Sequence, residues 1–183
     1  PARSLKFTML ERLRDHLRPH WPLIGHLAFT LIVTLAAMNT QNNILFWVVG
    51  VLLTVLIVSL LWSHISIRGI DVQRLDPRHG AVGEPMSLRY RITNRRRWLP
   101  VFNLIIEERA GGPHANWSRL MHGGRAWVMH VGPGETVHGE AVFWPQARGE
   151  VRLDRLTVRT RFPFGLVRRT KHVSQATHTL VYP

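Results

Sequence analysis

Two long apolar stretches without charge lie close together near the start of the chain. The first covers residues 21–38 and the second residues 44–62, and no Lys, Arg, Asp or Glu occurs between residues 18 and 68. An α-helix rises about 1.5 Å per residue and the hydrocarbon core of a bilayer is about 30 Å thick, so each stretch can cross a membrane, the first only just. In lipid each span must satisfy its own backbone, which only helices of this kind can do. We therefore predict a transmembrane helical hairpin over residues 21–62, closed by the polar turn 39–43.

Two other interpretations compete with membrane insertion. A cleaved signal peptide also has a basic start and an apolar stretch, but no clear small-x-small cleavage site precedes the turn, and a second apolar stretch follows at once. Two buried core helices of a soluble protein would seldom run for this length without one charge. The pattern therefore favours a membrane-spanning pair.

Basic residues flank the predicted hairpin on both sides, whereas its turn carries no charge. Under the positive-inside rule, this distribution places both chain ends in the cytoplasm and the Asn-rich turn outside. Trp21 and Trp62 then lie together at the cytoplasmic interface, and Trp47 lies near the opposite one. The flanking basic residues are Arg3, Lys6, Arg12, Arg14 and Arg18 before the hairpin and Arg68, Arg74 and Arg78 after it.

The first 20 residues have a pattern of their own. Leu10, Leu13 and Leu17 recur at helical spacing while charged residues fill the other face, and Pro19 then interrupts the pattern. We predict a basic amphipathic juxtamembrane segment over residues 1–20 that lies on the membrane surface. The alternative is an extension of the first transmembrane helix, bent at Pro19.

From His64 onward the apolar period changes to two, which is typical of strands with one buried face. Turn signals rich in Gly and Pro separate about seven such runs. We predict that residues 63–183 form one cytoplasmic domain, an immunoglobulin-like antiparallel β-sandwich that follows the α-hairpin in a mainly β chain. The apolar positions of these runs are Met86, Leu88, Tyr90 and Ile92; Phe102, Leu104 and Ile106; Trp127, Met129 and Val131; Val137, Gly139, Ala141 and Phe143; and Val151 and Leu153.

The alternation slips by one residue in two places. Ile65 and Ile67 are followed by apolar residues at 70 and 72, and Val151 and Leu153 are followed by apolar residues at 156 and 158. A β-bulge produces such a slip, and Gly69 can adopt the positive φ that some bulges require. Both slips are therefore predicted to be β-bulges.

The chain is strongly basic and has no cysteine. Its formal net charge is +13, and residues 63–183 hold 19 basic and 9 acidic residues. A domain tethered to an anionic leaflet has reason to be basic, and the aromatic–basic alternation of a nucleic-acid stacking platform is missing. We therefore expect the basic residues to face anionic lipid rather than nucleic acid. The lack of cysteine excludes thiol nucleophiles, disulfides and thiolate metal sites.

The histidines do not form a metal-binding motif. Four of them are eight residues apart, but glycine-rich turns separate them, and no carboxylate accompanies them at ligand spacing. His26, within the first apolar stretch, is expected to be a neutral imidazole near the interface or against the second helix rather than part of a proton relay. We predict no metal site. The four evenly spaced residues are His114, His122, His130 and His138.

Glu107 and Glu108 are the only adjacent carboxylates. Neighbouring residues of a strand point to opposite faces, so these two cannot converge on one substrate. Neither a phosphate-binding loop nor a nucleophile elbow occurs. The sequence therefore predicts no catalytic residue, no cofactor-binding residue and no cofactor, and we expect a protein that is not an enzyme.

Three stretches together resemble a bacterial family. They are residues 42–45 at the start of the second apolar stretch; residues 80–85, which lead into the strand ending at residue 94; and residues 148–151 followed by 160–166 and 181–183. The chain resembles the membrane-anchored N-terminal half of the domain-of-unknown-function-fifty-eight family. The resemblance implies a bacterial inner-membrane protein with a hairpin anchor, a β-sandwich and then an α/β domain related to von Willebrand factor A modules. Because the sequence stops where that domain should begin, we expect either a fragment or a short member.

The same resemblance implies partners. Genes of this family often accompany MoxR-type AAA+ ATPases and transglutaminase-like membrane proteins. We therefore expect a non-enzymatic scaffold or adaptor at the bacterial inner membrane that works with such an ATPase in the assembly of membrane-associated complexes. Two alternatives remain open: a basic module that binds anionic lipid or nucleic acid, and a membrane-anchoring subunit of an enzyme complex.

The turn Phe162-Pro163-Phe164-Gly165 belongs to the third stretch of this resemblance. In one interpretation its two Phe side chains fill the end of the sandwich, and in the other the turn is a docking surface. Since large aromatic side chains usually belong to a core, we favour the structural interpretation and predict that Phe164 is buried.

Overall fold

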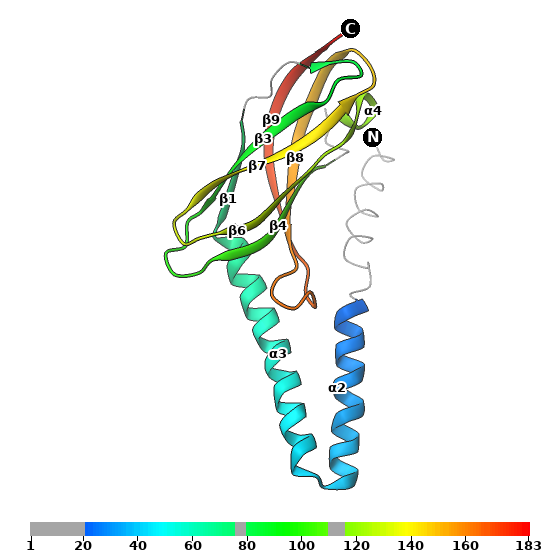
Figure 1. The fold of residues 1–183 in the computed structure, drawn as a ribbon, viewed down its shortest axis with the longest axis vertical. Helices are drawn as coiled ribbons and strands as arrows, with labels where there is room; N and C mark the ends of the chain where they lie inside the picture. The colour runs from blue at the N-terminus through cyan, green and yellow to red at the C-terminus, as the bar shows by residue number, and fades with distance from the viewer. Residues whose placement is uncertain (1–20, 76–79, 110–115) are drawn as a thin grey trace, which may run out of the picture.

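The computed structural model describes residues 21–75, 80–109 and 116–183. The predicted amphipathic segment 1–20 lies outside these residues. Two long helices form an antiparallel pair, and a strand-rich region stands at their open end (Figure 1). The second helix leads directly into the first strand, so no flexible linker separates the two parts.

The helices are α2, Trp21–Thr40, and α3, Asn43–Arg68. The polar turn between them closes the pair, because Asn42 caps α3: its Oδ1 accepts a hydrogen bond from the Ile44 amide at 2.9 Å. Gln41 adopts a left-handed φ of 53° in the same turn. The predicted helical hairpin is therefore present, with a turn of only residues 41–42 instead of the predicted 39–43.

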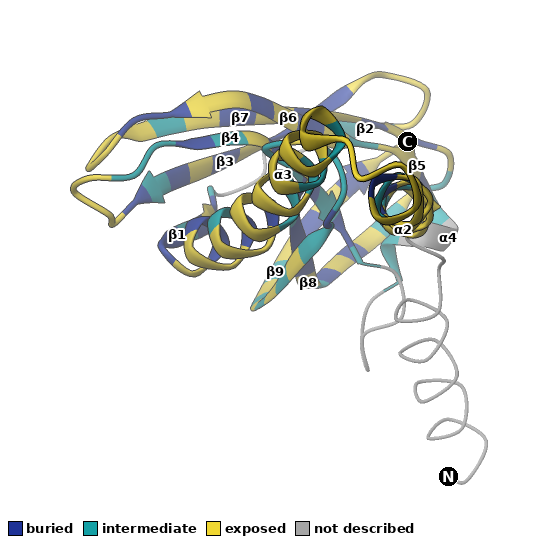
Figure 2. Cartoon of the chain, turned by 90° about the horizontal axis from the view of Figure 1, so that it is seen from below, coloured by how far each residue is buried: buried dark blue, intermediate teal, exposed yellow. Residues whose placement is uncertain are grey.

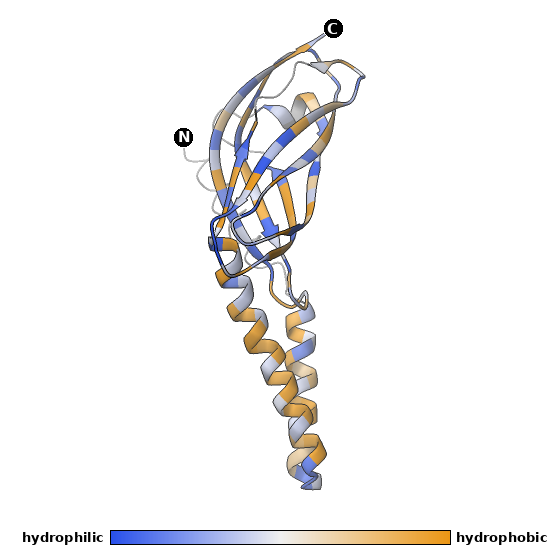
Figure 3. Cartoon of the chain, turned by 60° about the vertical axis from the view of Figure 1, so that its left-hand side comes forward, coloured by the Kyte–Doolittle hydropathy of each residue, from blue (hydrophilic) through white to orange (hydrophobic). Residues whose placement is uncertain are grey.

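Both helices leave their apolar side chains uncovered. In the most apolar 18-residue window of each, 11% of α2 and 6% of α3 is buried, and each helix is long and apolar enough to cross a membrane. Figure 2 shows the exposed surface of the two helices, and Figure 3 shows that it is largely hydrophobic. The described chain does not cover them as it would the core helices of a soluble protein.

The helix α3 continues past the predicted boundary at residue 62. It ends at Arg68, where the amide of Gly69 bonds to the Ser66 carbonyl oxygen at 3.3 Å. Ile65 and Ile67 are therefore helical, and the predicted β-bulge across Arg68 and Gly69 is wrong. The slip in the apolar pattern marks the change from a helical to a strand period.

The strand-rich region contains two sheets. The four-stranded sheet has the order β1-β3-β7-β5 and the five-stranded sheet the order β2-β9-β8-β4-β6. All pairs are antiparallel except the short parallel pair of β2 with β9. The strands are β1 Ile70–Arg74, β2 Gly80–Ala81, β3 Met86–Asn94, β4 Val101–Glu108, β5 Met121–Gly123, β6 Arg125–Val131, β7 Thr136–Pro145, β8 Gly149–Thr160 and β9 Arg169–Tyr182, and a short helix α4, Trp117–Leu120, precedes β5.

One hydrophobic core is shared by the two sheets. The alternation predicted for residues 86–92 is confirmed, since Leu88, Tyr90 and Ile92 are fully buried. The five-stranded sheet contributes Leu104 and Leu153, among others, to the same cluster. The register shows which strand ends lie next to the helices, because Ile70, two residues after the end of α3, pairs with Asn94.

Strand β8 agrees with the sequence pattern, whereas β6 and β9 differ from it. The predicted bulge in β8 is confirmed by a register shift between Leu153 and Arg155. In β6 the buried positions are Ala126, Val128 and Val131, so Trp127 and Met129 point outward and, of the three predicted apolar positions, only Val131 lines the core. The sequence did not predict β9, since its inward positions are mostly polar.

Candidate functional site

A buried ion pair joins the two sheets. The Arg74 guanidinium of β1 contacts the Glu108 carboxylate of β4 through two hydrogen bonds, Nε to Oε1 at 2.9 Å and Nη2 to Oε2 at 2.6 Å. Both side chains are fully shielded from solvent. The Tyr90 hydroxyl of β3 donates a third hydrogen bond to Glu108 Oε1 at 2.9 Å. The bidentate geometry is the strongest that an arginine and a carboxylate can form.

The remaining Arg74 donors bind β8 and β9. Nη1 lies 2.8 Å from both the Gln175 carbonyl oxygen and Thr177 Oγ1, and 3.3 Å from the Leu153 carbonyl oxygen. The Gln175 side chain in turn bonds to both backbone groups of Arg74. This network explains why the inward positions 175 and 177 of β9 are polar.

The chemistry of this network is structural rather than catalytic. Burial, followed by the nearby Glu108 charge, raises the pKa of the Tyr90 hydroxyl far above its ordinary value. Tyr90 therefore stays a neutral donor to the Glu108 carboxylate, which is also paired with Arg74. With both charged groups enclosed, no substrate can reach them, and the network acts as a clamp between the sheets.

The two adjacent carboxylates point to opposite faces, as predicted. Glu107 lies on the outer face of the five-stranded sheet, where Arg125 approaches it at 2.7 Å and Arg159 at 2.6 Å. Glu108 lies in the core. The buried pair has a signal in the alternation, because Arg74 and Glu108 share the inward parity of Ile70 and Ile106.

Beside Glu107, an apolar patch lies on the outer face of β4 and β6. We call Ile105, Trp127 and Met129 the outer patch. The side chains of Trp127 and Met129 are 63% and 69% exposed. Asn103, with a left-handed φ of 52°, orients the indole, because its Oδ1 accepts the Trp127 Nε1 hydrogen at 2.8 Å. The indole is therefore held in place while its ring stays open to solvent.

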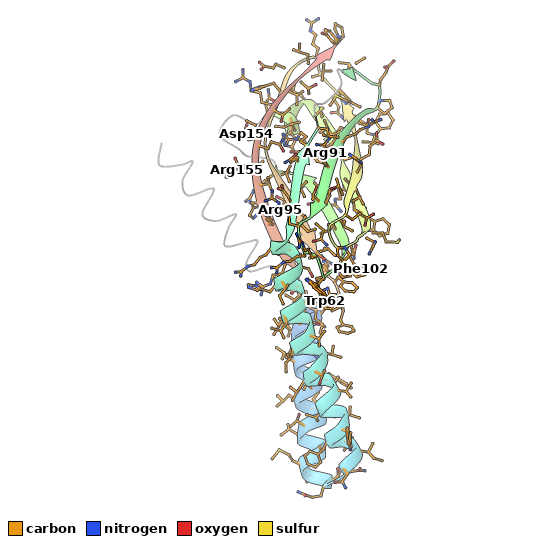
Figure 4. The ribbon with its side chains drawn as sticks, turned by 90° about the vertical axis from the view of Figure 1, so that its left-hand side faces the viewer. Trp62, Arg91, Arg95, Phe102, Asp154 and Arg155 are labelled. Atoms are coloured by element: carbon orange, nitrogen blue, oxygen red, sulfur yellow. The ribbon has the colours of Figure 1, made fainter. Side chains whose placement is uncertain are left out.

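A second aromatic group lies where α3 meets the sheets. The Phe162 ring lies 6.0 Å from the Trp62 ring of α3 and 4.6 Å from the Phe102 ring of β4. Trp62 and Phe102 are seen together at this junction in Figure 4. The prediction that Phe164 is buried is wrong, because this side chain is 53% exposed. Phe162, rather than Phe164, fills the end of the strand-rich region.

The histidines are dispersed. Among the described residues, no group of three or more His, Asp or Glu side chains could hold a metal ion. His122, His130 and His138 lie on three different strands, and His114 falls outside the described residues. His26 donates from Nε2 to the Leu52 carbonyl oxygen of α3 at 3.0 Å, so it lies against the second helix as predicted.

No family model matches the chain, and no curated protein matches it either. The resemblance to the domain-of-unknown-function-fifty-eight family therefore stays a prediction from the residues that carry it.

Proposed function

We propose that this protein is a non-enzymatic membrane-anchored scaffold that presents an immunoglobulin-like β-sandwich on a helical stalk. One observation carries the proposal: two uncovered apolar helices lead without a linker into a strand-rich region with an ordered core. The apolar surface of the hairpin is stable only in an apolar environment, and the bilayer supplies one. In this proposal residues 21–62 form the anchor in the bacterial inner membrane and residues 63–183 the cytoplasmic domain, with both termini on the cytoplasmic side.

The orientation can be tested by labelling, because the chain has no cysteine. Asn43 lies exposed at the hairpin turn and Glu84 lies exposed in a turn of the strand-rich region. In intact cells with a permeabilised outer membrane, an impermeant maleimide should label Asn43→Cys. Glu84→Cys should be labelled only after the inner membrane is opened. The reverse pattern would invert the orientation, and labelling of neither variant after solubilisation would contradict the exposure of these sites.

The outer patch is the surface that we propose for partner binding. Trp, Met and Arg are enriched in protein interfaces, and here Trp127 and Met129 lie beside the ion-paired Arg125. The resemblance suggests a MoxR-type AAA+ ATPase as the partner, and this identification is part of the proposal. A scaffold of this kind holds its partner at the membrane without contributing catalytic groups.

Partner binding can be tested with matched tryptophan variants. Trp144 lies on the outer face of β7 in the other sheet and is 51% exposed, which makes it a close control for Trp127. The full-length protein in nanodiscs should bind the purified ATPase encoded nearest to it. Trp127→Ser should weaken binding by about tenfold or more, whereas Trp144→Ser should leave it unchanged. Equal effects of the two changes would remove the outer patch as the docking surface.

A basic module for anionic ligands is the second candidate function. The excess of basic over acidic residues after position 62 supports it. Phosphate contacts weaken steeply as salt rises, whereas a largely apolar protein interface does not. Binding of the full-length protein to a DNA duplex and to the ATPase at 50 mM and 200 mM salt would therefore separate the two functions.

A further inference from the structure

Three buried donors in the described part of the chain have no hydrogen-bond partner. They are Trp62 Nε1, Ser66 Oγ and Arg169 Nε. Buried polar groups are almost always paired, so each unpaired group requires an explanation, such as a bound molecule. The indole and guanidinium nitrogens can only donate, and the serine hydroxyl can donate as well. A molecule that satisfies all three must therefore offer several acceptors.

The three donors come from two elements that contact each other, α3 and the start of β9, at the junction of α3 with the loop between β8 and β9. Trp62 and Ser66 are four residues apart and so lie on the same face of α3. The Phe162 ring contacts Trp62, and the Phe162 amide bonds to Thr160 Oγ1 at 3.2 Å. Thr160 pairs with Arg169 across the ladder, which places Arg169 at the β9 end of the same loop.

A second contact fixes the direction in which Arg169 points. Two-residue alternation places it on the same face of β9 as Lys171. Lys171 Nζ donates to the carbonyl oxygen of Ile70, two residues after the end of α3, at 2.5 Å. This face of β9 is therefore turned toward the helix, and Arg169 lies one step closer to the loop.

The charge of the junction favours an anion. Arg169 is permanently cationic, and Arg161 lies exposed at the start of the loop. No Asp or Glu occurs anywhere in residues 155–183. Donors alone, a fixed positive charge and the lack of nearby carboxylates on this segment together suit a phosphate group, which has several strong acceptor oxygens.

The position of the junction relative to the proposed bilayer favours a lipid as the source of the phosphate. Trp62 lies 19 residues after the start of α3, which corresponds to about 29 Å along the helix and so to the edge of the hydrocarbon core. The loop between β8 and β9 lies alongside this part of α3 (Figure 1). Its Phe164 side chain is 53% exposed and can enter the interfacial layer.

We propose that the junction of α3 with the β8–β9 loop binds the phosphate of an anionic phospholipid in the adjacent leaflet. Trp62, Ser66 and Arg169 donate to its oxygens, and Phe164 rests among the acyl chains beside it. The proposal rests on membrane insertion of the hairpin, and it adds a defined lipid site to the scaffold.

The site can be tested with variants that remove one donor each. Trp62→Phe keeps an aromatic ring for Phe162, Ser66→Ala removes only the hydroxyl, and Arg169→Gln removes the charge. The full-length protein in nanodiscs of phosphatidylcholine should gain thermal stability as phosphatidylglycerol is added. Each variant should need about tenfold more phosphatidylglycerol for the same gain, because a hydrogen bond to a charged group is lost.

Matched controls use the same residue types away from the junction. Trp144→Phe and Arg125→Gln change exposed side chains of the strand-rich region and should keep the wild-type response to phosphatidylglycerol. Inorganic phosphate at millimolar concentration should not replace the lipid. If it stabilises the wild-type protein in phosphatidylcholine alone to the same extent, the ligand is a free anion and the lipid assignment is wrong.

Insertion of the loop gives an independent measurement. Bimane attached to Phe164→Cys should show a blue-shifted emission in nanodiscs, whereas bimane on Leu180→Cys, near the distal end of β9, should emit as in water. A wild-type protein that gains nothing from phosphatidylglycerol, or junction variants that respond like the controls, would overturn the lipid site. The cysteine labelling of Asn43 and Glu84 would still stand in that case, so failure of the site is distinct from failure of the anchor.

Discussion

At the scale of single residues, the buried ion pair between Arg74 and Glu108 is the feature with the largest energetic consequence. The parity of the sequence was enough to predict that Glu107 and Glu108 point to opposite faces. The same parity does not predict that Glu108 is buried, because a carboxylate enters a core only with a partner. That partner, Arg74, lies 34 residues away in the chain, and only the folded sheets bring the two together.

Removing one partner of this pair should destabilise the fold strongly. Glu108→Ala leaves the Arg74 guanidinium buried without a counter-charge, and we expect a loss of roughly 3–5 kcal/mol in the free energy of unfolding. Glu107→Ala, on the exposed face, should cost about 1 kcal/mol or less. Chemical denaturation of the full-length protein in detergent, followed by near-ultraviolet circular dichroism, measures both.

The double variant Arg74→Met with Glu108→Leu supplies the decisive comparison. It removes both charges and retains apolar volume, so it should recover much of the stability that Glu108→Ala loses. A double variant as unstable as the single one would show that the hydrogen bonds of Arg74 to β8 and β9, rather than its charge, hold the sheets together.

At the scale of elements, the change from helix to strand shows where the spacing of apolar residues predicts secondary structure and where it does not. Residues 65 and 67 fit an alternating pattern and also the last turn of α3, and the structure shows the helix. The bulge in β8 was predictable because both sides of the slip lie within strands. In β6 the two largest apolar side chains face outward, so hydrophobicity alone indicated the wrong face.

The loop between β8 and β9 yields a prediction that separates its two phenylalanines. Phe162 lies between Trp62 and Phe102, so Phe162→Ala should lower the free energy of unfolding by roughly 1–2 kcal/mol. Phe164→Ala changes an exposed side chain and should shift the free energy of unfolding by about 0.5 kcal/mol or less. Thermal melts of the two variants in the same detergent make the comparison, and a larger effect of Phe164→Ala would contradict the packing described above.

At the scale of the whole molecule, the sequence was sufficient for the order of the parts. Uncharged length predicted the helical pair, and alternation predicted the strands that follow it. The sequence did not predict how the nine strands pair into two sheets, because the register depends on contacts between distant segments. The sequence did not predict the proposed lipid site either, since its three donors come from a helix and a strand about a hundred residues apart.

The direct passage from α3 into β1 makes the strand-rich region a lever arm. The apolar stretch of α3, residues 44–62, extends about 29 Å, close to the hydrocarbon thickness of about 30 Å. In the proposed membrane anchor, such a helix tilts in a thinner bilayer, and the tilt decreases as the bilayer thickens. Because only Gly69 separates helix from strand, this change of angle is transmitted to the far end of the sheets.

Energy transfer from a dye on Leu180→Cys to a dye in the lipid headgroups should therefore change with acyl-chain length, whereas transfer from Phe164→Cys, close to the pivot, should change little. Equal changes at the two positions would show that the joint is flexible. With a stiff joint, the thickness of the surrounding membrane sets the height at which a bound partner is held.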